Sequence, residues 1–595
     1  MKREDLRGAS APWGELLNYS AFFVDALPFG PIAAFIPDDP DFEFQWHLNN
    51  TGQTGGTAGI DINVTEVWND YTGTGVVIGI IDDGVQHDHP DLAANYDTAL
   101  DHDARDRDSD AAPGTADDNH GTTVAGTIAA DGDNGVGLTG VAYDATIAGF
   151  RMGYGSAGTT GQVVESLALQ VNVDISNNSW GYGGYFVDDF SSSEFRPAGD
   201  AILNAVTAGR DGLGTVYVFA AGNERGFGGD VNYHNFQNSP HTIAVAALDH
   251  NGQVASFSTP GAAVLVSAPG VDIATTDRTG GDGYVDGDYV YISGTSFSSP
   301  ITSGVAALML EANPGLGYRD VQEILAYSAR QTDSSSPGWD VNGAANWNGG
   351  GLHTSHDYGF GLVDAHAAVR LAESWGLTST QANLATLSAS SAPALVISDH
   401  TTITDTITLT SGLNIDHIEV DLDLSHTWIG DLVVSLTSPD DTTSILVNQP
   451  GFGGAGQDNI DFTLSSTHSW GETGAGTWTL SVTDLGTLDQ GSLNSWTLRL
   501  LGDAINTDDT YIYTDEFGAF SGVDDASRRI LSDADGNDTL NAAAVTSNSV
   551  INLNPGANGT LAGNSLTIAA GTFIENAYAG DGNDCKAPVL CTTSR

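Results

Sequence analysis

Three short motifs in this sequence each carry a side chain that hydrolytic enzymes use. Asp82 lies in the run DDG, His120 begins the run HGT, and Ser296 lies in the run GTSFSSP. Each motif alone is more often a turn, a loop histidine or a helix N-cap. Their joint occurrence in the order Asp, His, Ser predicts a catalytic triad. Acyl transfer needs a hydroxyl nucleophile, an imidazole that takes its proton and a carboxylate that orients the imidazole.

Asn223 is the fourth candidate for this chemistry. It closes the run AAGN, directly after an apolar segment, where its side-chain amide could donate to the oxyanion of a tetrahedral intermediate. Loss of one such donor costs about a hundred- to thousandfold in rate. The alternative is a plain turn at the end of a strand. A helix that starts at Ser296 would add a backbone N–H and a positive helix end to the same place.

Buried strands must hold these residues in place. Residues 75–81 and 216–221 are short, β-branched and nearly free of polar side chains, as in strands buried on both faces. Residues 160–172 and 296–312 are predicted helices, and the alternation of strand and helix indicates a doubly wound α/β domain. Ligands of such domains sit beyond the carboxyl ends of the strands, where Asp82 and Asn223 fall.

The pattern changes after residue 375, and 595 residues suggest two to four domains. Residues 376–396 are rich in Ser, Thr and Ala and are predicted to be a linker. Residues 397–503 carry short alternating runs between Gly/Asp turns, which predict an all-β sandwich. From residue 504 the chain is rich in Asn, Asp, Gly and Thr, and the run DGND at 535–538 recurs at 581–584 as a weak repeat.

The overall charge excludes some partners. The chain has 76 Asp and Glu against 18 Lys and Arg, a net charge of −58. We therefore expect no nucleic acid partner, because binding a phosphate backbone relies on basic side chains. So many carboxylates repel one another unless salt screens them or cations bind them, which indicates calcium. No apolar run is long enough for a membrane span.

With these motifs in place, the sequence resembles the subtilisin-like serine proteases, most closely the kexin/furin (proprotein convertase-like) branch, over residues 39–503. The runs around Asp82, His120, Asn223 and Ser296 match the family's catalytic Asp, His, oxyanion Asn and nucleophile. Further matches are QWHLNNTG (45–52), HPDL (89–92), NNSWG (177–181) and YGFGLVDA (358–365). The resemblance implies a subtilisin-like fold and hydrolysis of protein or peptide substrates through Ser296.

The remaining segments resemble two further families. The runs HTWIGDL (426–432), GTWTL (476–480) and GSLNSWTL (491–498) resemble the P (homoB) domain of convertases. The runs TYIYTDEF (510–517) and AGTFIENAYAGDGND (570–584) resemble the calcium-binding C-terminal region of serralysin-like and other RTX exoproteins. The pattern breaks in the tail, which holds both cysteines, Cys585 and Cys591.

These resemblances predict the following organisation. The domains are an N-terminal extension (1–38), a peptidase domain (39–375), a linker (376–396), a P-domain sandwich (397–503), an RTX-like calcium-binding region (504–584) and an atypical tail (585–595).

The resemblance also implies a calcium site in the peptidase domain. The ligands correspond to the side chains of Asp39, Asp91 and Asn134 and to the carbonyls of Asp131, Val136 and Leu138. Such an oxygen-only set suits Ca²⁺. The alternative is an acidic loop without an ion. A second calcium site of the convertases is lost in this comparison, because its acidic positions read Gly184 and Thr259 here.

Substrate choice is expected to differ from that of the convertases. Where they hold an arginine side chain with an acidic residue, this sequence has His234, so strict dibasic cleavage is not expected. Four acids could still form a negative pocket or could instead be solvated loop acids: Asp83, Asp188, Asp189 and Asp230.

We therefore expect a secreted, calcium-dependent serine endopeptidase that acts as a monomer outside a bacterial cell. The competing class is a non-catalytic extracellular protein that binds calcium or matrix on a protease scaffold. The intact set of Asp82, His120, Asn223 and Ser296 argues against that class. The first residues lack a standard signal peptide. RTX exoproteins leave the cell by a type I secretion apparatus, which is thus an expected partner.

Overall fold

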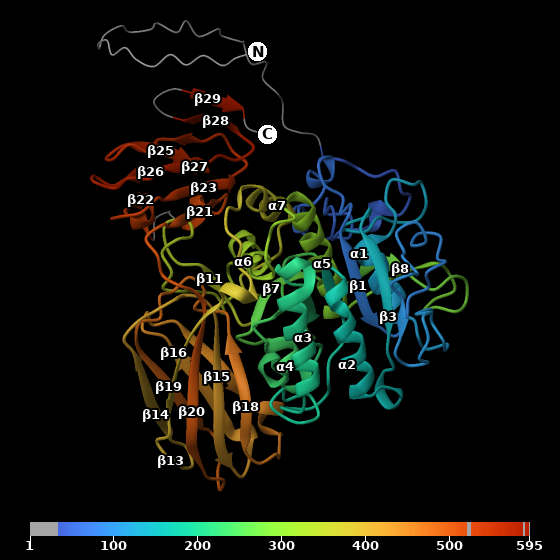
Figure 1. Cartoon of the computed structure of the whole chain (residues 1–595), viewed down its shortest axis with the longest axis horizontal. Helices are drawn as coiled ribbons and strands as arrows, with labels where there is room; N and C mark the ends of the chain where they lie inside the picture. Colours follow the sequence, from blue (N-terminus) through green and yellow to red (C-terminus); the bar gives the residue numbers. More distant parts are fainter. Residues whose placement is uncertain (1–33, 521–524, 587–589, 594–595) are drawn as a thin grey trace, which may run out of the picture.

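The computed structural model describes residues 34–520, 525–586 and 590–593. Three units follow one another along the chain: an α/β domain, a β-sandwich and a C-terminal β region, and both β units lie beside the α/β domain (Figure 1). The N-terminal extension expected over 1–38 falls outside the described residues up to residue 33. None of the helices within the described ranges is long and apolar enough to cross a membrane.

A seven-stranded parallel sheet forms the centre of the α/β domain, in the order β2-β3-β1-β4-β5-β6-β7. The strands are β1 Val77–Asp82, β2 His102–Asp103, β3 Thr146–Arg151, β4 Ile175–Asn178, β5 Val216–Ala220, β6 Thr242–Leu248 and β7 Val264–Pro269. The expected strands at 75–81 and 216–221 are β1 and β5, and both are almost wholly buried. This confirms the predicted doubly wound fold class.

Helices pack around this sheet. They are α1 His120–Ala129, α2 Thr160–Leu169, α3 Arg196–Ala208, α4 Asn235–Asn238, α5 Thr295–Ala312, α6 Tyr318–Ser328 and α7 Ala365–Ser374. The helix predicted over 160–172 becomes a 3-10 turn after Leu169, and the helix predicted from residue 296 begins at Thr295. Helix α5 packs on β4 to β7 and contacts α1, so it brings its own start close to that helix.

Small two-stranded sheets complete the domain. They pair β8 Ile273–Thr276 with β9 Tyr289–Ile292, and β10 Asp340–Val341 with β11 His353–Thr354.

The second unit is the predicted sandwich. One sheet contains β12 Ala385–Ser391, β13 Leu395–Ile397, β15 Asn414–His426, β18 Ile460–Ser466 and β20 Gly491–Asp503. The other contains β14 Thr402–Leu409, β16 Leu432–Thr437, β17 Thr443–Asn448 and β19 Gly476–Asp484. Alternate residues of β19 are buried, as expected for a strand with one face on a core.

The sandwich begins earlier than its predicted start at residue 397. Within the expected linker 376–396, β12 pairs with β20 along its whole length, and β13 pairs with β20 further on. The Ser/Thr/Ala composition was interpreted as a linker, but half-exposed strands at a sheet edge tolerate the same small polar residues.

The C-terminal region is built from two sheets. One joins β21 Thr510–Thr514, β23 Thr539–Ala544 and β27 Asn576–Tyr578, all parallel. The other joins β22 Ile530–Leu531, β24 Val550–Ile551, β25 Asn558–Leu561, β26 Asn564–Ile568, β28 Asn583–Lys586 and β29 Leu590–Thr593. A short helix, α8 Phe517–Phe520, follows β21.

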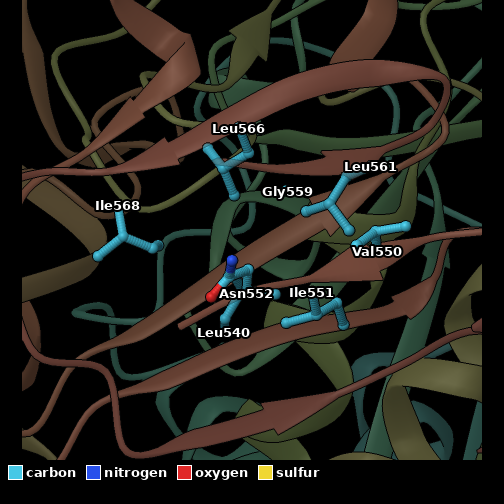
Figure 2. Close-up of a pocket in the computed structure, with 8 residues that line it drawn as sticks. All are labelled: Leu540, Val550, Ile551, Asn552, Gly559, Leu561, Leu566 and Ile568. Carbon is cyan, nitrogen blue, oxygen red and sulfur yellow. The ribbon is translucent and has the colours of Figure 1, made fainter. Parts of the chain in front are cut away.

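A small apolar cavity lies in the core of this region (Figure 2). Its lining residues are Leu540, Val550, Ile551, Asn552, Gly559, Leu561, Leu566 and Ile568. Within the tail expected to be atypical from residue 585, β28 pairs with β29 and places Cys585 opposite Cys591.

Candidate active site

The end of β1 and the start of α1 bring Asp82 and His120 together. Asp82 is the last residue of β1 and His120 the first of α1. Nδ1 of His120 lies 2.9 Å from Oδ1 and 3.1 Å from Oδ2 of Asp82. Because a carboxylate only accepts, this contact selects the imidazole tautomer that carries its proton on Nδ1. Nε2 then keeps a free lone pair, as a general base requires.

The Asp82 carboxylate is itself held in place. Oδ1 accepts hydrogen bonds from the hydroxyl of Tyr154 at 2.9 Å and from the backbone N–H of Asp83 at 2.8 Å. Asp82 is almost fully buried, so its orientation cannot relax toward solvent. The carboxylate is therefore fixed against the imidazole by several elements.

Ser296 lies in the first turn of α5, beside this pair. The ring of the next residue, Phe297, has its centroid 6.0 Å from that of His120. The Ser296 hydroxyl donates to the carbonyl of Ser179 across 3.4 Å, and the Ser179 hydroxyl donates back to the Ser296 carbonyl at 2.8 Å. Without substrate such catalytic hydroxyls often make long, poorly aligned bonds. Ser296 is partly exposed.

Asn223 follows β5 and faces the start of α5. Its Oδ1 accepts from the backbone N–H and from the hydroxyl of Thr295, each at 3.1 Å. With the oxygen engaged, the amide nitrogen is left as a donor near the N-terminus of the helix. An exposed donor beside Ser296 suits an oxyanion.

The buried charges around His120 favour its protonated form. Burial lowers the pKa of His120, but the charge of Asp82, the hydrogen bond with Asp82 and the charge of Asp83 together outweigh burial and raise the pKa to about 9. Burial also raises the pKa of the neighbouring Asp83 to about 7, with the charge of Asp82 adding to the effect. The imidazolium form of His120 is thus stabilised in this site.

The predicted calcium ligands gather around one loop of the peptidase domain. The Asp39 carboxylate accepts from the backbone of Asp133 at 2.7 Å and of Asn134 at 3.1 Å. The Asp91 carboxylate accepts from the backbone of Leu138 at 3.0 Å, and the Asn134 amide reaches it at 3.5 Å.

Two more of the predicted ligands belong to the same loop. Asp131 accepts from the Asn134 amide at 3.1 Å, and the backbone N–H of Val136 donates to Oδ1 of Asn134 at 2.6 Å. The structure therefore brings together the side chains of Asp39, Asp91, Asp131 and Asn134. Asp39 and Asp91 are buried, and their partners here are neutral N–H and O–H groups. Burial raises the pKa of Asp91 to about 7. Carboxylates without a cationic partner fit an oxygen-ligated Ca²⁺.

The sequence analysis predicted a calcium-binding region over 504–584 but named no ligands in it, and the structure places a second group of acids there. Carboxylate oxygens of Asp509, Asp533 and Asp538 lie within 4.8 Å of one another. The only signal in the sequence was the first DGND run, which contains Asp538. The second run has a different environment, because Asp581 contacts His366 at 2.7 Å and Arg370 at 3.2 Å on α7.

The four acids expected near the substrate pocket are engaged within the fold. Asp188 is buried and lies 2.8 Å from Nδ1 of His234. Asp230 is buried and accepts from the backbone of Asn232, while Asp189 accepts from the backbone of Ser191. Asp83 is buried against the start of α1. Three of the four are thus neither solvated loop acids nor open to a substrate.

An acid that the sequence analysis did not select stands at the site instead. Glu224 directly follows Asn223, is exposed, and accepts from the hydroxyl of Thr259 at 3.2 Å. Its position next to the oxyanion candidate was the signal that could have found it.

Comparison with known proteins matches each unit to a family. Residues 73–361 match the subtilase family, residues 415–500 the proprotein convertase P-domain, and residues 505–587 the serralysin C-terminal region of peptidase family M10.

Among relatives, human proprotein convertase subtilisin/kexin type 4 is 33% identical over 79% of this chain and 61% of its own length. Human neuroendocrine convertase 2 is 33% identical over 78% of this chain and 74% of its own length. The chain thus spans about three fifths of the length of the first of these relatives.

A solved structure of a serine protease of Aeromonas sobria is also similar. Its TM-score is 0.72 at 25% identity, and the match covers 80% of this chain and 97% of that one. The same protease has been solved in a complex with its chaperone, ORF2.

Proposed function

Because this chain belongs to the subtilase family, in the branch that joins a subtilase domain to a proprotein convertase P-domain, we propose that it is a serine endopeptidase with Ser296 as its nucleophile. The observation that carries the proposal is the contact of His120 with Asp82 beside the start of α5. A general base with a fixed tautomer next to a hydroxyl at a helix N-terminus is the arrangement that acyl transfer needs.

The reaction proceeds in two halves. Nε2 of His120 takes the proton of the Ser296 hydroxyl while Oγ attacks the carbonyl carbon of the peptide, and Asp82 stabilises the imidazolium. The amide of Asn223 donates to the resulting oxyanion. His120 then gives its proton to the leaving amine, which leaves an acyl-enzyme on Ser296. Water, deprotonated by the same imidazole, hydrolyses the acyl-enzyme.

Specificity is broader than strict dibasic cleavage in this proposal. His234 is protonated over more of the pH range than a free histidine, because Asp188 raises its pKa despite burial, which alone would lower it. The pair is therefore close to neutral and offers little to a substrate cation. Glu224 supplies the remaining exposed negative charge, so Arg and Lys are accepted but not required.

Calcium and secretion complete the proposal. Ca²⁺ would be held by the side chains of Asp39, Asp91 and Asn134 and by the carbonyls of Asp131, Val136 and Leu138, and would neutralise buried carboxylates there. The serralysin-like C-terminal region supports an extracellular enzyme. Monomeric action and export through a type I apparatus stay predictions.

Replacement of the nucleophile tests the proposal. Ser296→Ala should abolish measurable hydrolysis of a peptide substrate, and His120→Ala should cost nearly as much because the triad acts as a unit. Ser298→Ala, two residues along the same helix and buried, is the matched control. Unchanged turnover by purified Ser296→Ala protein would refute the serine protease assignment.

A further inference from the structure

Helix α1, which begins with the proposed catalytic base, has no cap of its own. The first backbone N–H groups of a helix lack partners within it. Asn119 precedes His120, yet its side chain makes no capping hydrogen bond. The first turn is buried except at His120, so water cannot readily take the place of a cap. The acceptor must therefore come from another part of the chain.

Asp83 supplies that acceptor from the end of β1. Its Oδ2 accepts from the backbone N–H of His120 at 3.1 Å, and its Oδ1 from that of Gly121 at 2.8 Å. Asp83 is only 4% exposed. Two consecutive acids therefore bind one histidine: Asp82 holds the ring and Asp83 holds the backbone.

The surroundings leave Asp83 little freedom. A Cβ added at Gly121 would lie 2.4 Å from the carbonyl oxygen of Gly84, so the helix start packs directly on the turn that follows Asp83. On the other side, Nε of Arg151 donates to the Asp83 carbonyl at 3.0 Å. Asp83 cannot turn toward a substrate without leaving two buried N–H groups unsatisfied.

We propose that Asp83 is a positioning residue for His120: it caps α1 from the end of β1 and so sets the place of the imidazole relative to Ser296. The inference rests on the proposed function, because it concerns the same site. It assigns Asp83 a role in the geometry of the base, in contrast to the substrate-facing negative pocket considered from the sequence.

The charge of Asp83 has a second effect on the base. Together with Asp82 it favours the imidazolium form of His120 and so contributes to its raised pKa. The other titratable or charged groups that face this acid pair or the start of α1 are Tyr154, Tyr284, Arg151 and Arg278. Removal of the Asp83 charge alone should therefore lower the pKa of His120.

Two substitutions separate the cap from the charge. Asp83→Asn keeps one acceptor and removes the charge, whereas Asp83→Ala removes both. We expect kcat to fall about tenfold in Asp83→Asn and about a hundredfold in Asp83→Ala, with KM nearly unchanged, because a misplaced base slows the chemical step. The midpoint of the rise of kcat/KM with pH should lie lower in Asp83→Asn than in the wild type, by about 0.5 pH units or more. Asp88→Asn, an exposed acid nearby, is the matched control and should change neither.

Two peptides distinguish positioning from substrate recognition. The two peptides differ only at the second residue on the amino side of the scissile bond, which is Arg in one peptide and Leu in the other. Asp83→Asn should slow both peptides by the same factor. A rise in KM confined to the Arg peptide, with kcat unchanged, would overturn the proposal.

A measurement that needs no activity decides the same question. NMR titration with ¹³C-labelled histidine, with the His120 signal assigned by its loss in His120→Gln, should give a lower pKa for His120 in Asp83→Asn than in the wild type. An identical His120 titration in the two proteins would refute the role of Asp83 even if the wild type proved inactive. Absence of hydrolysis by the wild type would refute the proposed function but not this inference. A thermal midpoint measured for each variant identifies any that fails to fold.

Discussion

At the scale of single residues, we expect the protonation of His120 to set the pH range of activity. The base must be neutral, and its pKa lies at about 9 because the charge of Asp82, its hydrogen bond and the charge of Asp83 together outweigh burial. We expect kcat/KM to rise with pH, with the midpoint of the rise well above about 6.5, the pKa of a free histidine.

The same shift affects stability. A folded-state pKa raised above the unfolded one contributes stability that is fully present below pH of about 6.5 and is lost as pH rises through about 9. The expected rise of kcat/KM with pH is tested by rates of hydrolysis of an uncharged peptide between pH 5 and 10. A limb centred at or below pH of about 6 would contradict the raised pKa.

A second prediction at this scale concerns the preference for basic substrates, on which we expect the charges of His234 and Asp188 to act at a distance. His234→Gln removes the positive charge and leaves Asp188 uncompensated, so kcat/KM for Arg relative to Leu substrates should rise, by about tenfold or 1.4 kcal/mol. Competition between an Arg peptide and an otherwise identical Leu peptide gives the ratio of their kcat/KM values directly. Asp188→Asn should move the ratio the other way. Equal ratios in all three proteins would place the pair outside the substrate pocket.

At the scale of elements, we expect the loop that joins α1 to β3 to depend on a bound cation for its stability. It is held to Asp39 and Asp91, whose buried carboxylates have neutral partners. An excess of chelator should lower the thermal midpoint relative to millimolar calcium, since an ion at about a hundred times its Kd adds about 2.7 kcal/mol. Sodium chloride should not substitute, because screening supplies no ligands.

A pair of variants locates this calcium effect. Asp39→Asn should remove most of the difference between chelator and calcium, whereas Asp144→Asn, an exposed acid in the same domain, should keep it. If Asp39→Asn keeps the full difference, the responsible ion lies elsewhere, and the carboxylates of Asp509, Asp533 and Asp538 become the sites to test.

At the scale of the whole molecule, buried ion pairs join the β units to the α/β domain. Arg319 of α6 lies 2.5 Å from Asp416 of β15 and 3.0 Å from Asp503 of β20. On the other side, Asp581 of the C-terminal region contacts His366 and Arg370 of α7. Both β units are therefore anchored on consecutive helices of the same domain.

Loss of the first anchor should destabilise the assembly. Arg319→Leu leaves Asp416 buried without its partner, which typically costs about 3 to 5 kcal/mol. The urea midpoint of the full chain should fall, and the double variant Arg319→Leu with Asp416→Leu should recover much of the loss. If the single variant keeps the wild-type midpoint, the domains are held together by other contacts.

Local patterns in the sequence were sufficient for the fold class and the family. Strands β1 and β5 could be predicted because a strand buried on both faces needs a short run of apolar residues, whatever its neighbours are. The triad candidates could be found because their chemistry restricts residue type, and β1 and α1 do place Asp82 against His120. Their catalytic roles stay predictions until the variants are measured.

Pairing across the chain could not be predicted in the same way. The linker interpretation of 376–396 failed because the strand character of β12 depends on β20, more than a hundred residues later. The sequence left Asp83 and Asp188 either in a negative pocket or as solvated loop acids, but their partners are a helix start and a histidine from other elements. Asp581 lies in a run typical of calcium turns, yet it binds α7. A side chain's burial and partners are set by the elements that pack on it, so the sequence determined which residues this protein has for its chemistry, and the packing determined what each one does.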